Sequence, residues 1–476
     1  MTKNMPMGVV VFAALALLSF PSLAETQREV PTSPAQVQLS YAPIVKKTAP
    51  AVVNIYTQKL VRQRVMSPFV MDPFFQHFFG GMPQGLSRQR LENSLGSGVI
   101  VKPDGLIVTS NHVIADADEI TVVLADRREF PAKLLLSDDH SDLAVLKIDP
   151  KGEALPYVAL KDSDDVEVGD LVIAIGNPFG VGQTVTSGIV SALARTNLDI
   201  NDLNYYIQTD AAINPGNSGG ALITMDGRLI GVNAAIYTKD GGNMGIGFAV
   251  PSNMVSATLA GLSKEKADGA TQHVARPWTG IAGQLVTADM AKSLGLVRPM
   301  GLLVNGLMPS SPAAKAGLKI GDVITSVNGK PVEDPAAFSY RIATSPLGGE
   351  ADLGVVRKGK MQIVRLPLVA PPEDPARQET AIKGRSPLAG ANIVNISPAV
   401  AVEYGLPIDS KGVLIVSISP ESSVAGLGIG KGDVLVSVNG EKIASVEDAV
   451  DALSQKARSW RLTFNRAGSL MTILVR

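Results

Sequence analysis

The sequence has no cysteine, only four histidines and a net charge of -1 across 476 residues. Without cysteine the chain can form neither a disulfide, nor a Cys-ligated zinc site, nor a thiol nucleophile. The near-zero net charge provides no electrostatic attraction to nucleic acid or to an anionic membrane. We therefore expect no nucleic-acid partner and no thiol chemistry.

Long apolar runs are missing everywhere except near the N-terminus. Lys3 provides a positive start, residues 9–20 are almost wholly apolar, and Ser22-Leu23-Ala24 is a small-residue cleavage site. This pattern predicts a signal peptide over residues 1–24, too short for a membrane span. We expect no integral membrane segment in the rest of the chain. An exported chain of this size without disulfides fits a bacterial periplasm.

The chain is longer than one hydrophobic core normally serves, so several domains are expected. Residues 25–40 are rich in Pro, Ser and Gln, which predicts disorder. Residues 41–262 contain short runs of strand-forming residues, such as 98–101 and 171–175, separated by Gly and Asp turns. Helical periodicity appears only at 251–262. This spacing predicts a mainly β domain built as barrels or a sandwich.

Residues 58–93 interrupt the strand pattern with basic residues, Pro and Gly. A loop this long inside a domain is usually functional or disordered. It carries five phenylalanines, which we expect to pack on a neighbouring subunit or on a site of the same chain: Phe69, Phe74, Phe75, Phe78 and Phe79.

The C-terminal half contains an internal repeat. Gly321-Asp322-Val323-Ile324 recurs as Gly432-Asp433-Val434-Leu435, and Val327-Asn328-Gly329 recurs as Val438-Asn439-Gly440. The constant offset predicts two homologous domains, which we assign to residues 263–370 and 371–476. Polar residues 263–276 and Pro-rich residues 370–386 are the linkers.

Residues 216–220, Gly-Asn-Ser-Gly-Gly, place three glycines around Ser218. Glycine accepts backbone angles that let several N–H groups converge on one point. A hydroxyl beside converging donors combines a nucleophile with an oxyanion hole, as acyl transfer requires. A Gly-rich turn without catalytic role is the alternative.

A serine nucleophile needs a base, and His112 is the best candidate among the four histidines. It lies where a β run enters a short helical turn. His77 is in the aromatic loop, His140 in an acidic turn and His273 in a linker.

The base needs an orienting carboxylate. Asp142 directly precedes residues 143–148, a run hydrophobic enough for a core strand. Asp138 and Asp139 are interpreted as solvated turn acids. Asp210 is a weaker alternative.

The order His112, Asp142, Ser218 is that of chymotrypsin-like enzymes. With segments 109–113, 141–145, 216–220 and 245–251 and the two repeats, the sequence resembles the HtrA/Do family of exported serine proteases, of the bacterial DegP and DegQ type. The resemblance implies a double six-stranded β-barrel with catalysis in the cleft between barrels, followed by two PDZ (α+β) domains. It further implies ATP-independent proteolysis of misfolded proteins, a possible chaperone role, and homotrimers that build higher oligomers. No metal or organic cofactor is expected.

By the same resemblance Ser218 attacks the scissile carbonyl, His112 transfers the proton, and Asp142 fixes the imidazole tautomer. The backbone N–H groups of Gly216 and Ser218 are the expected oxyanion donors, with Asn217 as a further candidate.

The substrate pocket in such enzymes is lined by residues just before the serine and on the following strand. These are Ala212, Ile213, Val232, Asn233, Ala234, Ala235 and Ile236. None is acidic, so we expect small to medium aliphatic side chains to be accepted.

In the first PDZ domain, Thr279, Gly280 and Ile281 are expected to bind C-terminal peptides. The second domain has Ala391 in place of Ile281, so a role in assembly or spacing is at least as plausible there. The resemblance also suggests that residues 69–79 obstruct a neighbouring cleft in a resting oligomer. The rival interpretation is a holdase or PDZ scaffold in which proteolysis is secondary.

Overall fold

The computed structural model describes residues 40–61, 90–115, 117–177, 182–195, 205–214, 216–236, 245–262, 274–384, 386–419, 422, 426–455 and 457–475. The predicted signal peptide, almost all of the predicted disordered segment and the five phenylalanines of the aromatic loop lie outside these residues, as do His77 and His273.

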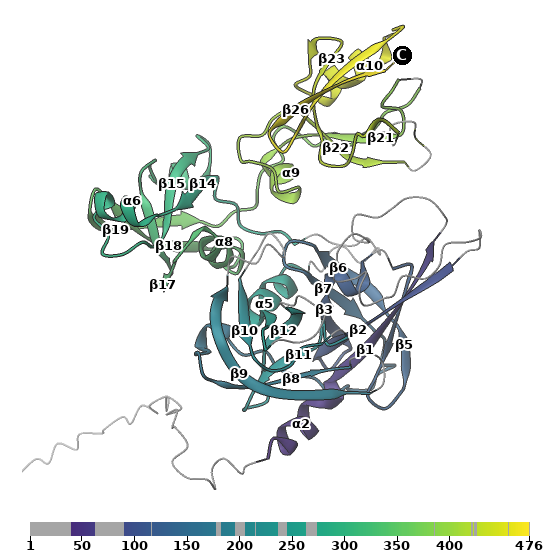
Figure 1. Ribbon diagram of the computed structural model, residues 1–476, viewed down its shortest axis with the longest axis vertical. Helices are drawn as coiled ribbons and strands as arrows, with labels where there is room; N and C mark the ends of the chain where they lie inside the picture. Colours follow the sequence, from purple (N-terminus) through teal and green to yellow (C-terminus); the bar gives the residue numbers. More distant parts are fainter. Residues whose placement is uncertain are drawn as a thin grey trace, which may run out of the picture. The chain divides into compact units, whose positions relative to one another are not determined.

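The first part of the protease-like domain is an antiparallel sheet with the order β5-β4-β1-β2-β3-β7-β6 (Figure 1). It follows a short helix, α2 (Ala42–Thr48). The two strands at the ends of this order, β5 and β6, are consecutive in the chain and separated by Ala132 alone. The first of them pairs with β4 and the second with β7. The implied six-stranded barrel therefore appears with one strand bent into two pieces. The strands are β1 (Val52–Val61), β2 (Arg90–Lys102), β3 (Leu106–Ser110), β4 (Glu119–Val123), β5 (Glu129–Pro131), β6 (Lys133–Asp138) and β7 (Leu143–Lys147).

The second part is a closed six-stranded barrel with the order β10-β13-β12-β11-β8-β9. Val172, Ala174 and Leu222 are fully buried in its hydrophobic core. The mainly β prediction for this domain is confirmed, and the expected helix after it is α5 (Ser252–Ala260). The strands are β8 (Leu171–Gly176), β9 (Thr184–Arg195), β10 (Tyr206–Thr209), β11 (Ala221–Thr224), β12 (Leu229–Ile236) and β13 (Gly247–Pro251).

The first repeat forms a sheet with the order β14-β15-β16-β18-β19, in which β17 also pairs with β16. The strands are β14 (Ile281–Leu285), β15 (Leu302–Leu307), β16 (Val323–Val327), β17 (Lys330–Pro331), β18 (Glu350–Arg357) and β19 (Lys360–Pro367). The helices are α6 (Ala288–Leu294), α7 (Pro312–Lys315) and α8 (Pro335–Ala343).

The second repeat has the same arrangement in β21-β22-β23-β25-β26, again with a short strand, β24, paired with β23. It has one additional strand, β20, on the outer edge of β21. The strands are β20 (Thr380–Ala381), β21 (Ala391–Asn395), β22 (Val413–Ile418), β23 (Val434–Val438), β24 (Glu441–Lys442), β25 (Trp460–Arg466) and β26 (Ser469–Val475). The helices are α9 (Pro398–Glu403) and α10 (Val446–Ser454), and Figure 1 shows this sheet in yellow-green.

Candidate active site

His112 and Asp142 are brought together by a helical turn and a strained loop. His112 lies on α4 (Asn111–Ile114), directly after β3. Asp142 adopts a left-handed conformation (φ 54°) immediately before β7, and its carbonyl accepts the Asn111 N–H at 3.0 Å. This places its carboxylate against the histidine.

The carboxylate contacts His112 through both oxygens. Oδ2 lies 2.7 Å from the ring Nδ1, and Oδ1 accepts the backbone N–H of His112 at 2.9 Å. The two side chains are only 28% and 14% exposed. A carboxylate at Nδ1 holds the proton on that nitrogen, which makes Nε2 the atom able to accept a proton.

Ser218 lies in a tight turn that can be built only with glycine. Gly219 has φ +80°, and a Cβ there would lie 2.1 Å from the Ser97 carbonyl oxygen and 2.3 Å from the Thr109 hydroxyl. The Ser97 N–H in turn donates to the Ser218 carbonyl at 2.9 Å. The serine turn is therefore packed directly on β2 and β3 of the first sheet.

One carbonyl connects the serine turn to the histidine segment. The Asn233 carbonyl on β12 accepts the Gly219 N–H at 2.7 Å and the Ser110 hydroxyl at 3.3 Å. Gly219 adjoins Ser218 and Ser110 lies two residues before His112, so the shared acceptor holds both segments to the same strand.

Two backbone donors beside the serine are available to a ligand. Within the described part of the chain, the N–H groups of Gly216 and Ser218 have no protein acceptor. The Asn217 N–H donates to the Asn214 carbonyl at 2.9 Å. This corrects the expectation that Asn217 adds a third donor, because its hydrogen is committed within the turn.

The Ser218 hydroxyl is itself engaged. It donates to the Ala234 carbonyl at 3.3 Å, which is long for an O–H···O bond, whose usual length is roughly 2.7–2.8 Å. A serine hydroxyl has one proton, so this weak bond has to be exchanged for one to His112 before the imidazole can accept that proton.

Of the residues predicted to line the substrate pocket, two make backbone contacts with the serine turn, Ala234 with Ser218 and Asn233 with Gly219. Ala234 contacts the Ser218 hydroxyl, and Ile213 is 1% exposed and packs beside Gly247 of β13. Ile213 is therefore a buried wall of the barrel core. The side chains of Ala235 and Ile236 are outside the described residues.

The alternative acids occupy other places. Asp210 accepts the Ile189 N–H at 2.7 Å through its Oδ1, so it supports β9. Asp138 is 4% exposed and ion-paired with Arg276, and Ser141 donates to it. The interpretation of Asp138 as a solvated acid is wrong, because its partner lies 138 residues away in the chain.

Three remaining expectations concern His140, a metal site and a membrane span. The His140 Nε2 lies 3.1 Å from the Glu403 carbonyl. The described residues contain no cluster of His, Asp and Glu able to hold a metal ion. No helix among them is both long and apolar enough to cross a membrane.

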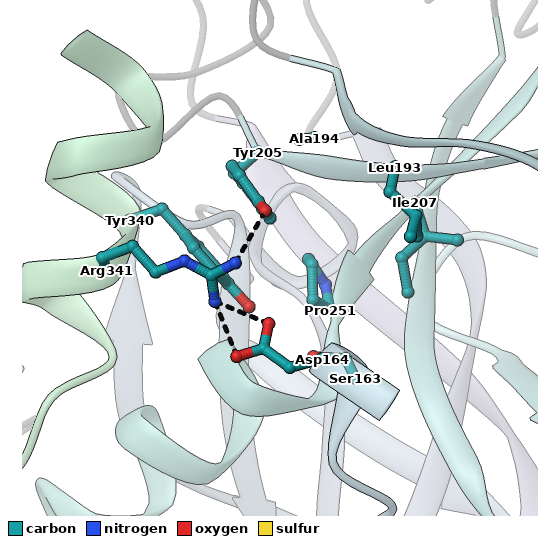
Figure 2. A pocket seen from close by; sticks show the side chains of 9 residues that line it. All are labelled: Ser163, Asp164, Leu193, Ala194, Tyr205, Ile207, Pro251, Tyr340 and Arg341. Atoms are coloured by element: carbon teal, nitrogen blue, oxygen red, sulfur yellow. Dashed lines mark hydrogen bonds and ion pairs between the residues drawn. The ribbon is translucent and has the colours of Figure 1, made fainter. Parts of the chain in front are cut away.

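A small hollow lies apart from these residues and is lined in part by Asp164, Tyr205, Tyr340 and Arg341 (Figure 2). The Arg341 Nη1 donates to both oxygens of Asp164 at 2.6 Å, and the rings of Tyr205 and Tyr340 stack with centroids 3.8 Å apart. Burial raises the pKa of Tyr205 and of Tyr340, so both phenols are neutral at physiological pH. With a volume of about 80 Å³ the hollow holds only a few water molecules and is too small for a peptide.

In the first repeat, the predicted peptide-binding loop precedes β14. Gly280 has φ +68°, and its carbonyl accepts the Met308 N–H at 3.0 Å. The N–H groups of Thr279 and Gly280 have no acceptor in the described part of the chain, and that of Ile281 makes only a 3.3 Å bond to the Thr279 hydroxyl. The helix α8 packs beside β14. Donors beside a strand edge and a helix are what a PDZ domain uses to bind a peptide.

Comparisons with known proteins agree with this architecture. Residues 96–232 match the trypsin-like peptidase domain, and residues 303–357 and 383–465 each match a PDZ domain. The chain is 38% identical over 493 residues to the periplasmic serine endoprotease DegP of Salmonella typhimurium, covering 98% of this chain and 99% of the relative. It is 37% identical over 492 residues to DegP of Escherichia coli K12, with the same two coverages.

Among solved structures, the chain resembles the HtrA-type protease AlgW, solved with a decapeptide. The TM-score is 0.52 and the sequence identity 42%, over 70% of this chain and 99% of that one.

Proposed function

The chain belongs to the DegP/HtrA family of serine endoproteases and is itself a serine protease, and we propose that it cleaves unfolded exported proteins in the periplasm through His112, Asp142 and Ser218. The observation that carries this proposal is the two-point contact of Asp142 with His112, together with the unengaged N–H groups of Gly216 and of Ser218 itself.

The mechanism follows from these contacts. Asp142 keeps the proton of His112 on Nδ1, so that Nε2 is free to accept a proton. Nε2 takes the Ser218 hydroxyl proton while the Ser218 Oγ attacks the scissile carbonyl. The resulting oxyanion is stabilised by the N–H groups of Gly216 and Ser218. His112 then returns the proton to the leaving amine, and Asp142 stabilises the imidazolium between these steps.

The apolar surroundings of the serine support a preference for aliphatic residues. Ala212, Val232 and Ala234 are small or apolar, and the nearest acid before the serine, Asp210, is bound to the backbone of β9. Aliphatic side chains are mostly buried in folded proteins, so an enzyme with this preference acts mainly on unfolded chains.

We assign C-terminal peptide recognition to Thr279, Gly280 and Ile281 of the first PDZ domain, on the strength of their unengaged donors. An extended peptide would add to the edge of β14, with its carboxylate at these N–H groups. The homotrimeric assembly implied by the family resemblance belongs to the same proposal.

The decisive experiment compares the mature protein with its Ser218→Ala and His112→Ala variants on unfolded casein. Each variant should fold normally and lose roughly 10⁴-fold or more in activity. Casein cleavage at near-parental rates by folded Ser218→Ala would refute the assignment of the nucleophile.

A chaperone role is the second candidate, and the same variant separates it from proteolysis. If Ser218→Ala suppresses the aggregation of a denatured protein as well as the parent does, holding and cutting coexist in one chain. Failure of that assay would leave the protease assignment untouched.

A further inference from the structure

In the second PDZ domain, residues 377–382 lie along the outer edge of β21. Thr380 pairs with Ile393 and Ala381 with Asn392 in antiparallel register. The pairing continues at both ends: the Ile382 N–H donates to the Ala391 carbonyl at 2.8 Å, and the Asn395 N–H donates to the Arg377 carbonyl at 2.8 Å. The free edge of this sheet is thus covered along the whole of β21.

Side chains hold the segment on the side that faces α10. Ile382 is 5% exposed and belongs to the same hydrophobic cluster as Ala449 and Leu453 of that helix. Asn395 donates to the Ala376 carbonyl and to the Gln378 side chain at 2.9 and 2.8 Å, and its oxygen accepts the N–H of Val446, the first residue of α10. Strand edge, segment and helix therefore form one packed unit.

The loop before β21 corresponds in geometry to the peptide-binding loop of the first PDZ domain. Gly390 has φ +90° and its carbonyl accepts the Ser419 N–H, as Gly280 (φ +68°) accepts from Met308. A Cβ on Gly390 would meet Ser422 at 2.7 Å, and one on Gly280 would meet Ser311 at 2.3 Å. The two glycines occupy equivalent positions.

The donors of the two loops differ in what they bind. In the second domain the N–H groups of Ala389, Gly390 and Ala391 donate to Ser386, Ile382 and Leu388, respectively. The Gly390 bond to the Ile382 carbonyl is 2.9 Å long. All three donors at the positions of Thr279, Gly280 and Ile281 are therefore used within the chain.

We propose that residues 377–382 occupy the peptide groove of the second PDZ domain as an internal ligand. They run antiparallel to the edge strand, as an added peptide would. The Ile382 carbonyl takes the place of a terminal carboxylate oxygen, and its side chain fills the apolar space between β21 and α10. A peptide from outside the chain finds this groove filled, so binding is left to the first PDZ domain.

The sequence supports the choice of Ile382 as the residue that fills this space. It stands eight residues before Gly390, whereas the residue eight before Gly280 is Gln272. A buried apolar anchor is thus encoded in the second repeat and has no apolar counterpart at that position in the first.

The absence of native cysteine makes a direct test possible in the full chain. In a Ser218→Ala background, which protects the probe from cleavage, Ala381→Cys and Asn392→Cys create one cross-strand pair. Neighbouring antiparallel residues have Cα atoms roughly 4.5–5.5 Å apart, within disulfide reach. The control combines Ala381→Cys with Ser417→Cys, because Ser417 pairs with Asn392 from the next strand and lies roughly 10 Å from residue 381.

The 381–392 pair should oxidise nearly completely with oxidised glutathione, and the 381–417 pair should stay reduced. Binding of a fluorescent peptide with an aliphatic C-terminus, measured against its C-terminal amide, should have the same stoichiometry in the reduced and the oxidised 381–392 protein. An unchanged stoichiometry of one peptide per chain supports the proposal. An unchanged stoichiometry of zero supports the internal ligand equally, but it would refute the assignment of peptide binding to the first PDZ domain.

Two results would overturn the proposal. One is a 381–392 pair that stays reduced in the folded protein. The other is a stoichiometry of two peptides per chain that falls to one on oxidation, because it would show that the segment leaves the groove to admit a peptide.

Discussion

Asp142→Asn tests the catalytic arrangement at the contact that organises it. The backbone N–H of His112 faces Oδ1 at 2.9 Å and can only donate, so the amide oxygen of asparagine must take that place. The amide nitrogen then faces the ring Nδ1, where Oδ2 lies at 2.7 Å. Two donors cannot share this contact, so the imidazole must move its proton from Nδ1 to Nε2.

A proton on Nε2 removes the base, because that nitrogen can no longer accept from Ser218. We expect kcat to fall by about 10⁴-fold, equivalent to roughly 5 kcal/mol at 1.36 kcal/mol per factor of ten. The assay is the rate of hydrolysis of a fluorogenic peptide with an aliphatic residue before the cut, with folding checked by circular dichroism.

The matched control is Asp210→Asn, the other acid that the sequence left as a candidate. Its amide oxygen keeps the bond to the Ile189 N–H, so kcat should remain at the parental value. A folded Asp142→Asn protein with kcat within tenfold of the parent would refute the tautomer argument. An inactive Asp210→Asn beside it would transfer the orienting role to Asp210.

Three further predictions concern the pocket, the serine turn and the buried ion pair. Mapped cuts in an unfolded substrate should cluster after Val, Ile, Ala or Leu, and predominant cleavage after Lys or Arg would show that the pocket is misplaced. Gly219→Ala forces a Cβ to 2.1 Å from a carbonyl and should cost at least about 10²-fold in kcat, whereas Gly169→Ala, with positive φ but open space around it, should keep full activity. Arg276→Ala leaves Asp138 buried without its cation and should lower the free energy of unfolding of the protease domain by about 3–5 kcal/mol, measured by denaturant titration. The exposed pair of Arg298 with Glu333 is its control, and an equal loss in Arg298→Ala would contradict the burial argument.

Strand positions and the placement of the candidate catalytic residues were accessible from the sequence because local patterns encode them. The run 143–148 is apolar at every position except Lys147, and it forms β7 with Asp142 immediately before it. The glycines around Ser218 predicted a turn with converging donors, and Gly216 and Gly219 do have positive φ. In these cases the residue type and its immediate neighbours determine the conformation.

Features that depend on distant partners were not accessible in this way. Asp138 looks like a surface turn acid until Arg276 is placed beside it. The Asn217 N–H was a plausible oxyanion donor until the turn directed it to Asn214. The pairing of one stretch with both β4 and β7 likewise depends on distant partners, although Pro131, which has no N–H to donate, marks the break locally.

The two PDZ domains differ at a position whose structural consequence is visible only from the packing around it. The sequence showed Ala391 where the first repeat has Ile281, and this suggested a weaker peptide site. In the structure Ala391 is fully buried and hydrogen-bonded to Ile382, which occupies the same cluster. The small side chain of Ala391 leaves room for the large side chain of Ile382. The small residue on the edge strand and the internal ligand that covers it therefore belong to one packing arrangement. By this argument, Ala391→Ile should disturb the segment 377–382 more than the core behind it.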